Sequence, residues 1–494
     1  MNITDALYRH ARERPAHLAI EDGKRIISYL ELAALVDRAV SRLQARTIKP
    51  GETVVVSLPD TAEHIVALFA LAKLGAVSLS VPESSLDHEK STAIEGMGVK
   101  AAILANGAAR FLDLGSIPVG ALVDGTAKDE AAVGQLTTPA AFDGDLPLMV
   151  TQSSGTTGVP KRLLLGHRQI VERNQPKIAL LRLSASDRFL QVPYLRFGWG
   201  RVGAIVMMNL GGTIVLNHGK TTEDFLRYFS DAGITCANLT PFHLRSILSC
   251  VTSDTPLWPN LRIAFSGAPL SAQERLLVRQ RLTPHLLEAY SSNEAGDVAL
   301  ASPEDQDRYP DSSGRLIAGI EARIADPNGS LLPFGETGEI GLRARHFPRE
   351  YLRNPEANAR HFRDGWFYPG DLAALNREGY VFLKGRTDDV INNAGVKYFP
   401  AEVEAVLLLH PSVADVAVIG GPHPIFGEVS VAYVVASAAI RPNELHKLCD
   451  GRIAMYKAPH WVFFLDALPR VAVGKPDKKK LRAMFRHYLE TEGR

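Results

Sequence analysis

The sequence predicts an α/β protein with a large N-terminal domain of mostly parallel sheets flanked by helices, a small β-rich subdomain and a small α+β C-terminal domain. The chain has 494 residues, which is several times the usual domain length, so at least two domains are expected. Up to about residue 380, short apolar runs alternate with stretches of helix length. After about Gly335 the runs become short and alternate in polarity, and a compact α+β unit begins at Asp388.

The N-terminal elements are predicted from hydrophobic periodicity and turn residues. Residues 1–20 have the pattern of an amphipathic helix with mixed charges. Segment 39–58 passes from a helical period into a β-branched strand after a Pro-Gly turn, and segment 62–81 places a helix before a strand with Gly75 at the break. Further buried strands are predicted within residues 188–194, 211–217, 234–240 and 261–267. Ligands of such parallel sheets usually lie beyond the carboxyl ends of the strands.

The later elements are shorter. Residues 335–345 and 379–386 alternate as antiparallel strands do, and predict the β-rich subdomain. The C-terminal unit is expected to contain a final basic helix and, before it, a helix in 401–411, strands in 413–421 and 428–437, a helix in 441–454 and a strand in 461–465. An Ala/Gly-rich stretch near residues 101–140 predicts surface loops and weak helices.

Composition excludes several classes of protein. Hydrophobic residues make up 46% and charged residues 22% of the chain, as in soluble globular proteins. The 55 basic and 54 acidic residues nearly cancel, so no global charge favours nucleic acid or a membrane surface. No apolar run of about 18 residues occurs, so we expect no membrane span and a cytoplasmic location. The three cysteines form no CxxC pair, which predicts buried free thiols rather than disulfides or a zinc site.

The strongest local signal is the segment 151–161, TQSSGTTGVPK, which follows a predicted strand. Glycine lets the backbone approach an anion, hydroxyl groups donate to phosphate oxygens, and Lys161 adds a positive charge. Because Lys161 follows a proline and precedes Arg162, the segment matches neither the GxxxxGK[ST] nor the GxGxxG pattern. On composition alone, an anion-binding loop and a flexible surface turn are equally good interpretations.

Eight motifs together identify the chain as similar to a known family. They occur in the order ISYLEL (27–32), the segment 151–161, FSGAPLS (265–271), EAYSSNEAG (288–296), GETGEIGL (335–342), DGWFYPGD (364–371), GRTDDVINNAG (385–395) and VGKPDKKKLR (473–482). This order resembles that of the acyl-adenylate-forming (AMP-binding) superfamily of acyl-CoA synthetases, adenylation domains and luciferases. The resemblance covers essentially the whole chain.

The resemblance implies a nucleotide site built from several motifs. The phosphates would be held by the loop residues Thr151, Ser153, Ser154, Gly155, Thr156, Thr157, Gly158 and Lys161, with Thr156 also among the catalytic residues. The flat adenine would lie between the tight turn Gly267, Ala268, Pro269 and the residues Glu288, Ala289, Tyr290. Tyr290 would stack on the base, Asp371 would accept hydrogen bonds from the ribose hydroxyls, and Arg386 would hold the nucleotide. Alternatively, Asp371 is an ordinary aspartate of a turn and Arg386 is a solvent-exposed arginine.

Glu294 is implied to be a Mg²⁺ ligand, the ion bridging phosphate oxygens. Its alternative interpretation is a carboxylate in the first turn of a helix, which the helix dipole favours. The preceding position is usually threonine in the family and is Asn293 here. Because the amide of Asn293 can still donate a hydrogen bond to a phosphate, we expect the nucleotide site to be modified but still active.

Lys475 is the predicted catalytic residue of adenylation. A lysine at this place would bridge the substrate carboxylate and the α-phosphate while pyrophosphate leaves. The alternative is a solvated basic tail, since three lysines follow closely. The family pattern usually continues with Ile, and Pro476 here restricts the backbone that presents Lys475.

The resemblance also implies two half-reactions and a mobile C-terminal domain. Residues 1–387 would form the N-terminal adenylating domain and residues 388–494 the mobile domain. Asp388 matches the family's hinge position, where a short polar side chain tolerates two backbone conformations. Gly395 falls where the family keeps a glycine facing the pantetheine tunnel. After acyl-AMP forms, the domain would turn and bring the Gly395 face to the site.

The acid pocket is less well predicted. Segment 193–201 lacks the aspartate that usually binds an amino-acid ammonium group, so an amino-acid substrate is not favoured. Arg196 falls where many acyl- and aryl-CoA synthetases place a histidine, and would pair with a polar or anionic group of the acid. An arginine that faces solvent or a structural carboxylate is an equally good interpretation. Trp199, Thr240 and Phe242 are further candidate walls or ordinary core residues.

The expected thiol is coenzyme A. Residues 400–404 have a Pro-x-Glu-Val-Glu pattern that resembles acyl-CoA synthetases more than peptide-synthetase domains. A carrier-protein phosphopantetheine is the alternative, and a non-catalytic nucleotide-binding homologue or a luciferase-like monooxygenase are remoter ones. The expected partners are ATP, Mg²⁺, a small carboxylic acid and the thiol, without nucleic acid, in a monomer or homodimer.

Overall fold

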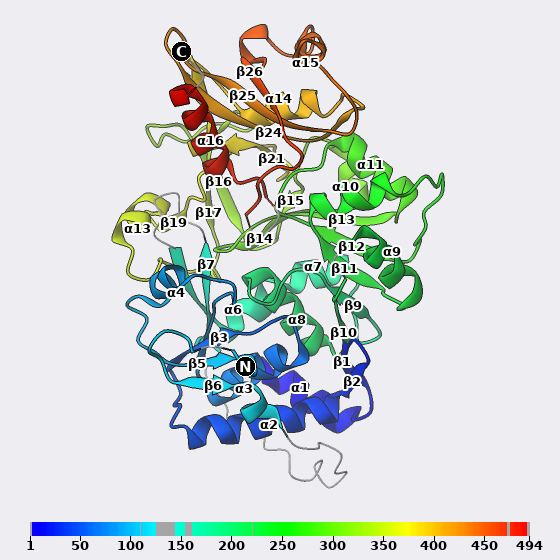
Figure 1. Cartoon of the computed structure of the whole chain (residues 1–494), viewed down its shortest axis with the longest axis vertical. Helices are drawn as coiled ribbons and strands as arrows, with labels where there is room; N and C mark the ends of the chain where they lie inside the picture. The colour runs from blue at the N-terminus through cyan, green and yellow to red at the C-terminus, as the bar shows by residue number, and fades with distance from the viewer. Residues whose placement is uncertain are drawn as a thin grey trace.

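A computed structural model describes residues 2–108, 110–124, 144–153, 161–219, 221–471 and 475–491 (Figure 1). The predicted loop residues Ser154, Gly155, Thr156, Thr157 and Gly158 lie outside the described residues. The predicted fold class is confirmed, because parallel sheets flanked by helices form the first part of the chain and a smaller α+β unit forms the last. In Figure 1 the first helices and the last helix lie toward opposite ends of the long axis.

The largest sheet is parallel at its centre and antiparallel at both edges. Within the described residues its strands lie in the order β15 (Arg315–Leu316), β14 (Gly296–Ala301), β13 (His285–Ser292), β12 (Arg262–Phe265), β11 (Cys236–Leu239), β9 (Arg188–Gln191), β10 (Thr213–Leu216), β1 (Leu18–Asp22) and β2 (Arg25–Ser28). All neighbours from β13 to β1 pair in parallel. Their carboxyl ends therefore share one edge, where the turns after β11 and β12 can meet a ligand.

A second sheet is also largely parallel. Its described strands lie in the order β6 (Ser116–Pro118), β5 (Val99–Leu104), β3 (Thr53–Ser57), β4 (Val77–Ser80), β7 (Pro147–Ser153) and β8 (Lys161–Gly166). Only β7 and β8 pair antiparallel, and their register places Ser153 opposite Lys161. The two ends of the predicted phosphate loop are therefore fixed in one hairpin.

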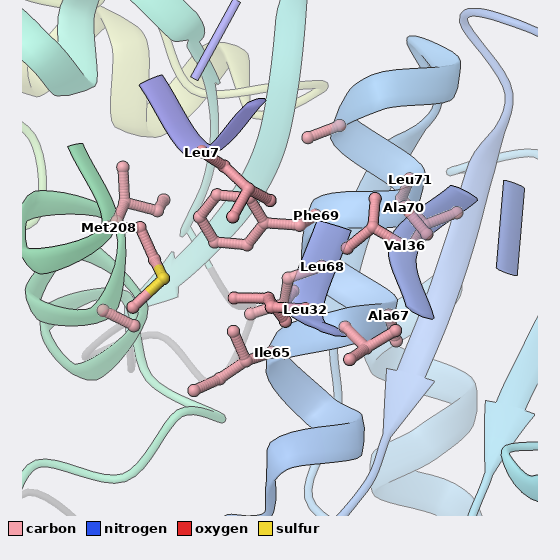
Figure 2. Packing of buried hydrophobic residues seen from close by; sticks show 14 of the residues in the cluster. Leu7, Leu32, Val36, Ile65, Ala67, Leu68, Phe69, Ala70, Leu71 and Met208 are labelled. Carbon is pink, nitrogen blue, oxygen red and sulfur yellow. The ribbon is translucent and has the colours of Figure 1, made fainter. Parts of the chain in front are cut away.

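Helices cover these two sheets. They are α1 (Thr4–Glu13), α2 (Tyr29–Ala45), α3 (Ala62–Leu74), α4 (Asp87–Ile94), α5 (Gly120–Val123), α6 (His167–Glu172), α7 (Gln175–Leu180), α8 (Gly198–Leu210), α9 (Thr222–Asp231), α10 (Pro241–Ser249), α11 (Ala272–Arg281) and α12 (Pro303–Arg308). Helix α3 is apolar all round, and every one of its residues except Glu63 is buried. It packs on β3 and β4 of one sheet and on β1 of the other, so it lies between the sheets. Figure 2 shows Leu7, Leu32 and Met208 around Phe69 of α3 in this core.

A small antiparallel sheet follows. Its strands are β18 (Phe362–Arg363), β19 (Trp366–Phe367), β17 (Gly338–Arg343), β20 (Asp371–Leu375) and β21 (Val381–Arg386), with β16 (Glu321–Ala325) beside β17. Helix α13 (Pro355–His361) leads directly into β18. Asp371 begins β20 and lies opposite Arg386, the last residue of β21, so the register itself brings these two predicted site residues together.

The C-terminal unit is one sheet with helices on both faces. Its strands are β23 (Val396–Tyr398), β22 (Ile391–Asn393), β25 (Gly427–Ala436) and β24 (Val413–His423), with β26 (Trp461–Phe464) parallel to β25, and its helices are α14 (Pro400–Leu407), α15 (Pro442–Cys449) and α16 (Lys478–Thr491). Along β24, Val416 and Val418 pack toward α14 and α15, whereas Ala417 and Ile419 pack toward α16. The boundary between 387 and 388 stays a prediction.

Two element predictions were wrong at their ends. The helix expected over residues 1–20 ends at Glu13, because Pro15 follows and disfavours helix in the residue before it, and β1 begins at Leu18. The helix expected over 441–454 ends at Cys449, and Gly451 then adopts a left-handed φ of 69° that terminates it.

Two further predictions need correction. Residues 101–104 of the Ala/Gly-rich stretch belong to the buried strand β5, because a position between β3 and β6 outweighs the weak strand preference of alanine. Cys236 and Cys449 are buried as expected, but Cys250 is exposed, since it follows the last turn of α10 at the surface. Within the described ranges, every helix falls short of the length and apolar character that a membrane crossing requires.

Candidate active site

The side chain of Asp371 has two partners, Tyr290 and Arg386. The hydroxyl group of Tyr290 donates to Asp371 Oδ2 at 2.7 Å, and Arg386 Nη1 lies 3.4 Å from Asp371 Oδ1. Arg386 Nη2 also donates to the carbonyl of Pro369 at 3.0 Å. Burial, and after it the Asp371 carboxylate, raises the pKa of Tyr290 well above its usual range. Tyr290 therefore stays a hydrogen-bond donor, and Asp371 is a fixed acceptor, as a ribose-binding carboxylate must be.

Glu294 lies in the turn between β13 and β14 and not in a helix, which removes the helix-dipole interpretation. Its side chain is buried, and its Oε1 accepts a hydrogen bond of 2.7 Å from the hydroxyl group of Tyr351. Tyr351 is 1% exposed, and burial together with Glu294 raises its pKa, so it too donates at all ordinary pH values. The carboxylate is thus held in one orientation with its second oxygen left to other partners.

Lys161 begins β8, directly after the predicted phosphate loop. Its ammonium nitrogen lies 2.6 Å from Nε2 of His361 and 5.5 Å above the ring of Tyr351. Burial lowers the pKa of Lys161, and the Glu294 carboxylate opposes this shift most strongly. Lys161 and Glu294 are therefore neighbours around Tyr351, one cationic and one anionic.

Lys475 reaches this cluster from the C-terminal unit. Its Cε lies 3.5 Å from the position that a Cβ would occupy on Gly267, so it lies over the turn that follows β12. More than a third of the residue is reached by water, yet protein surrounds it closely enough for burial to lower its pKa. Arg386 lowers that pKa further, whereas Asp371 and Glu294 raise it.

The backbone around Lys475 is anchored on both sides of Pro476. Val471 donates its N–H to the Lys475 carbonyl at 2.9 Å, and Arg470 pairs with Pro476 as an isolated bridge. The proline that departs from the family pattern thus takes part in the pairing that presents Lys475. The terminal-tail interpretation does not fit this contact with Gly267.

Other predicted nucleotide residues surround the same place. Gly198, the first residue of α8, would bring a Cβ within 3.1 Å of Thr151 Cγ2 and 4.0 Å of Asn293 Oδ1, so the motifs of Thr151 and Asn293 meet at the start of α8. Gly267, Ala268 and Pro269 form the water-accessible turn after β12. Gly267 has a φ of 101°, which only glycine adopts readily, so the sequence motif encodes this turn directly.

Glu288 has a different partner from the predicted adenine. Its buried carboxylate forms an ion pair with Arg275 of α11, and that guanidinium also donates to the carbonyl of Ser312 at 3.2 Å. Ala289 beside it is 4% exposed. The Glu288 side chain therefore helps to hold α11 on the sheet, and its place beside the base stays a prediction.

A mostly apolar cavity lies beside α8. Its lining comes from α7, α8, β9 and β11 and consists of Asn174, Lys177, Ile178, Leu181, Leu183, Phe189, Trp199, Val202, Gly203, Val206, Met207, Cys236, Ala237 and Asn238. Lys177 forms a buried ion pair of 2.8 Å with Asp297. Asn238 is 8% exposed; its backbone pairs with β12, and its side chain forms no hydrogen bond with the described residues. Trp199 thus lines a cavity, and its role in an acid pocket stays a prediction.

The other three candidates for the acid pocket lie elsewhere. The Arg196 guanidinium stacks 3.8 Å over the ring of Tyr194, with the carboxylates of Asp60 and Glu83 within electrostatic range. Thr240 precedes α10 and its hydroxyl group hydrogen-bonds His243 Nδ1 at 2.8 Å. Phe242 is 45% exposed and lies under the guanidinium of Arg470 at 4.8 Å, a contact between α10 and the C-terminal unit. None of the three lines the cavity.

The predicted hinge and thiol-tunnel residues, Asp388 and Gly395, both lie in turns. Asp388 belongs to a short 3₁₀ turn after β21 and forms an exposed ion pair with Arg360 of α13. Gly395 lies in the exposed turn between β22 and β23, with a φ of 90° and no atom within 4 Å of a built Cβ. Backbone conformation thus explains the glycine in this structure, and its role in a tunnel stays a prediction.

Three partners at the site were missed from the sequence: Tyr351, His361 and Arg360. They come from α13 and the segment before it, which no predicted motif included. Tyr351 is 57 residues from Glu294 and His361 is 200 residues from Lys161 along the chain. No spacing rule connects residues so far apart, so only the folded structure identifies them.

The donor set fits Mg²⁺ bound mainly by a nucleotide. The described residues contain no group of three or more His, Cys, Asp or Glu side chains placed to hold a metal ion. Mg²⁺ commonly takes one or two carboxylates and completes its shell with phosphates and water. A single oriented carboxylate, Glu294, in electrostatic range of Lys161 meets that requirement.

Comparisons with known proteins agree with this geometry. Residues 7–352 match the AMP-binding enzyme family, and residues 402–475 match the AMP-binding enzyme C-terminal domain. An indoleacetate–CoA ligase of Aromatoleum aromaticum is 31% identical, with 98% of each chain covered. A fatty acid–[acyl-carrier-protein] ligase, ScoC, of Streptomyces coeruleorubidus is 28% identical over 96% of this chain and 95% of its own.

A solved structure supplies the nucleotide comparison. O-succinylbenzoate coenzyme A synthetase from Bacillus subtilis, in complex with ATP and a magnesium ion, superposes with a TM-score of 0.84 at 25% identity. The match covers 98% of this chain and 99% of that one. The described residues therefore share their overall fold with that enzyme, from the N-terminal sheets to the C-terminal unit.

Proposed function

The chain belongs to the AMP-binding enzyme family, and we propose that its own residues activate a carboxylic acid with ATP and then pass the acyl group to coenzyme A. It is an AMP-forming acid–thiol ligase that uses ATP and Mg²⁺. The observation that carries the assignment of roles is the contact of Lys475 with the Gly267 turn, in range of Asp371 and Glu294. A lysine from a separate unit at this place suits the first half-reaction.

In that half-reaction a carboxylate oxygen of the acid attacks the α-phosphorus of ATP, the bond to the β-phosphate oxygen breaks, and pyrophosphate leaves. Lys475 would stabilise the charge that develops between the carboxylate and the α-phosphate. Asp371 would fix the ribose, and Lys161 would hold the phosphates. Glu294 would hold Mg²⁺, which neutralises phosphate charge when bound.

In the second half-reaction a thiolate attacks the acyl carbonyl and AMP leaves. Lys475 has no task in this step, so the C-terminal unit, residues 388–494, would turn about Asp388 and present the Gly395 face instead. The exposed Arg360–Asp388 ion pair is weak enough to break in such a turn. The arrangement with Lys475 at Gly267 is thus proposed as the adenylating one.

Coenzyme A is the proposed thiol. Beside the Gly395 hairpin lies a pocket of about 240 Å³, lined by Phe426, Tyr456 and Met455, among other residues. Aromatic side chains of this kind can stack on a flat base such as the adenine of coenzyme A. The carrier-protein alternative also has support, since one relative is named for an acyl-carrier-protein substrate.

A Tyr456→Ala variant separates the two thiols. If coenzyme A binds in this pocket, the variant should raise the KM for coenzyme A and leave the KM for pantetheine, which lacks the nucleotide, unchanged. An equal effect on both thiols would place the nucleotide elsewhere. Thioester formation with a phosphopantetheinylated carrier but not with coenzyme A would favour the carrier.

The proposed acid is a monocarboxylate with an apolar body and at most one neutral hydrogen-bonding group. The cavity beside Trp199 is lined mainly by apolar side chains, and its one cation, Lys177, is already paired with Asp297. The unpartnered amide of Asn238 offers a neutral contact. The name of the indoleacetate–CoA ligase is consistent with this class.

The enzyme would work in the cytoplasm as a monomer or homodimer, where ATP and coenzyme A are both available. The direct test is pyrophosphate release from Mg-ATP with aliphatic, aromatic and dicarboxylic acids, with hydroxylamine trapping the acyl adenylate and coenzyme A added afterwards. Release with one acid class that disappears in Lys475→Ala supports the proposal. ATP binding without release for any acid would favour the non-catalytic alternative.

A further inference from the structure

We propose that His361 is a positioning residue that fixes the ammonium group of Lys161 for the phosphates of ATP, an inference that rests on the proposed function. His361 Nδ1 lies 2.6 Å from the carbonyl oxygen of Tyr368, and His361 Nε2 lies 2.6 Å from Lys161 Nζ. A carbonyl oxygen only accepts, so Nδ1 carries the proton and Nε2 presents its lone pair to the lysine. The Tyr368 carbonyl thereby sets the tautomer that can bind Lys161.

The imidazole is held rigidly enough to act as an anchor. His361 is 5% exposed and is the last residue of α13. Its ring meets the ring of Tyr351 edge to face, with centroids 5.8 Å apart. A lysine has a long flexible side chain, so fixing its end beforehand removes an ordering cost that ATP binding would otherwise bear.

The same pair of rings also holds the carboxylate proposed for Mg²⁺. Tyr351 donates to Glu294 Oε1 at 2.7 Å, while the Lys161 ammonium lies over the Tyr351 ring at 5.5 Å. The cation and the carboxylate are therefore set at a fixed spacing by Tyr351 and His361. A magnesium-bound triphosphate presents both kinds of charge, and preorganised spacing favours its binding.

The charges around His361 keep it in the accepting form. Burial lowers the pKa of His361, and Lys161 on β8 and Arg360 on α13 lower it further. The Tyr368 carbonyl and Glu294, in the turn after β13, act in the opposite direction without reversing the shift. Neutral His361 therefore faces protonated Lys161 at neutral pH.

Two substitutions of His361 separate its two contacts. In His361→Asn the side-chain amide can still donate to the Tyr368 carbonyl, but no atom reaches Lys161. In His361→Gln the longer amide can place its oxygen near the former Nε2 and accept from Lys161. We expect His361→Asn to raise the Kd for ATP about tenfold, as for a lost hydrogen bond to a charged group, and His361→Gln to recover much of the affinity.

A double-mutant cycle on ATP binding, measured by calorimetry, tests whether His361 acts through Lys161. The structure predicts that His361→Asn has no further effect in a Lys161→Ala background. Additive losses, or unchanged ATP binding in His361→Asn, would overturn the inference. Because the readout is binding, the cycle works without a known acid, and failure of the proposed function would appear separately as ATP binding without pyrophosphate release.

His167→Asn is the matched control for the cost of replacing a buried histidine by asparagine. His167 is 1% exposed, follows the end of β8 opposite to Lys161, and its Nδ1 accepts a hydrogen bond from the backbone N–H of Ile3. This control should lower the Tm without changing the Kd for ATP. If His361→Asn does not fold, the cycle is run with His361→Gln and a bulkier apolar variant, His361→Leu, and the same additivity criterion applies.

Discussion

The nucleotide side and the acid side of the site hold their polar groups in different ways. Asp371, Glu294 and Lys161 are each fixed by a side chain from a distant segment. In the proposed acid cavity, the side chain of Asn238 forms no hydrogen bond with the described residues, and outside this cavity Arg196 stacks on the exposed ring of Tyr194. The nucleotide side is thus preorganised for one constant ligand, whereas the acid side consists mainly of apolar packing that can change with the acid.

The largest effect is expected at Lys475, which the C-terminal unit places over the Gly267 turn. Lys475→Ala should lower the rate of adenylation by a factor of about 10² to 10³, because it removes charge stabilisation present only in the transition state. Thioester formation from supplied acyl adenylate should stay near the wild-type rate. The two half-reactions are measured separately by quenched-flow assays.

Lys479→Ala is the matched control, since Lys479 is an exposed residue of α16 in the same basic segment. It should change neither half-reaction. A loss in both half-reactions with Lys475→Ala would contradict the separation of roles between adenylation and thioester formation.

The pH dependence tests the charge of the same lysine. Burial and Arg386 lower the pKa of Lys475 despite Asp371 and Glu294, and the protonated form is the active one. The kcat/KM for adenylation should therefore fall with rising pH through this lowered pKa, at a lower pH than for an ordinary lysine near 10.5. In Lys475→Arg, the residual kcat/KM should not fall in this pH range, because arginine stays protonated. The same fall at high pH in both proteins would show that another group causes it.

On the nucleotide side, Asp371→Asn should raise the KM for ATP about 10- to 100-fold, since it weakens charged hydrogen bonds to the ribose. Tyr290→Phe removes only the hydroxyl group that donates to Asp371 and should give a smaller rise. Steady-state kinetics with ATP varied at saturating acid provide the measurement. The comparison of the two sides fails if these variants change acid selectivity instead.

On the acid side, Asn238→Leu should change the ratio of kcat/KM between an apolar acid and its hydroxylated analogue by about tenfold, with the KM for ATP unaltered. The amide contributes one neutral hydrogen bond, so the effect is limited in size. A competition assay with both acids in one mixture measures the ratio. An unchanged ratio together with a higher KM for ATP would contradict the assignment of the cavity to the acid.

The smallest effect is expected at Arg196, whose guanidinium is engaged by Tyr194 and lies near Asp60 and Glu83. The sequence-based hypothesis pairs it with an anionic group of the acid. Arg196→Ala should then reduce activity on a dicarboxylate more than on a monocarboxylate. Equal losses on both acids would remove Arg196 from substrate recognition.

Residues whose role depends on backbone shape or strand register could be predicted from the sequence. Gly267 needs its left-handed φ, and Asp371 begins β20 opposite Arg386 at the end of β21, so motifs encode their positions locally. His361 and Tyr351 could not be predicted, because their partners lie in other sheets and only tertiary packing brings them together. The acid cavity is of the same kind, since side chains from α7, α8, β9 and β11 share it without any sequence pattern.

The same distinction explains the errors in the fold. Strand β5 contains several alanines, and only its place between β3 and β6 makes it a strand. A proline ends α1 and a glycine with left-handed φ ends α15. The prediction from helical periodicity had extended both helices past these residues. Local residues such as proline and glycine thus determine where a helix ends. Contacts with neighbouring strands determine whether a segment such as β5 becomes a strand.

Exchange of labelled pyrophosphate into ATP tests most directly whether Lys475 and the nucleotide cluster form one adenylating site. The account predicts exchange that depends on an apolar carboxylic acid, needs no thiol, disappears in Lys475→Ala and persists in Lys479→Ala. Acid-dependent exchange that survives in Lys475→Ala, or no exchange with any acid by a protein that binds ATP, would contradict it.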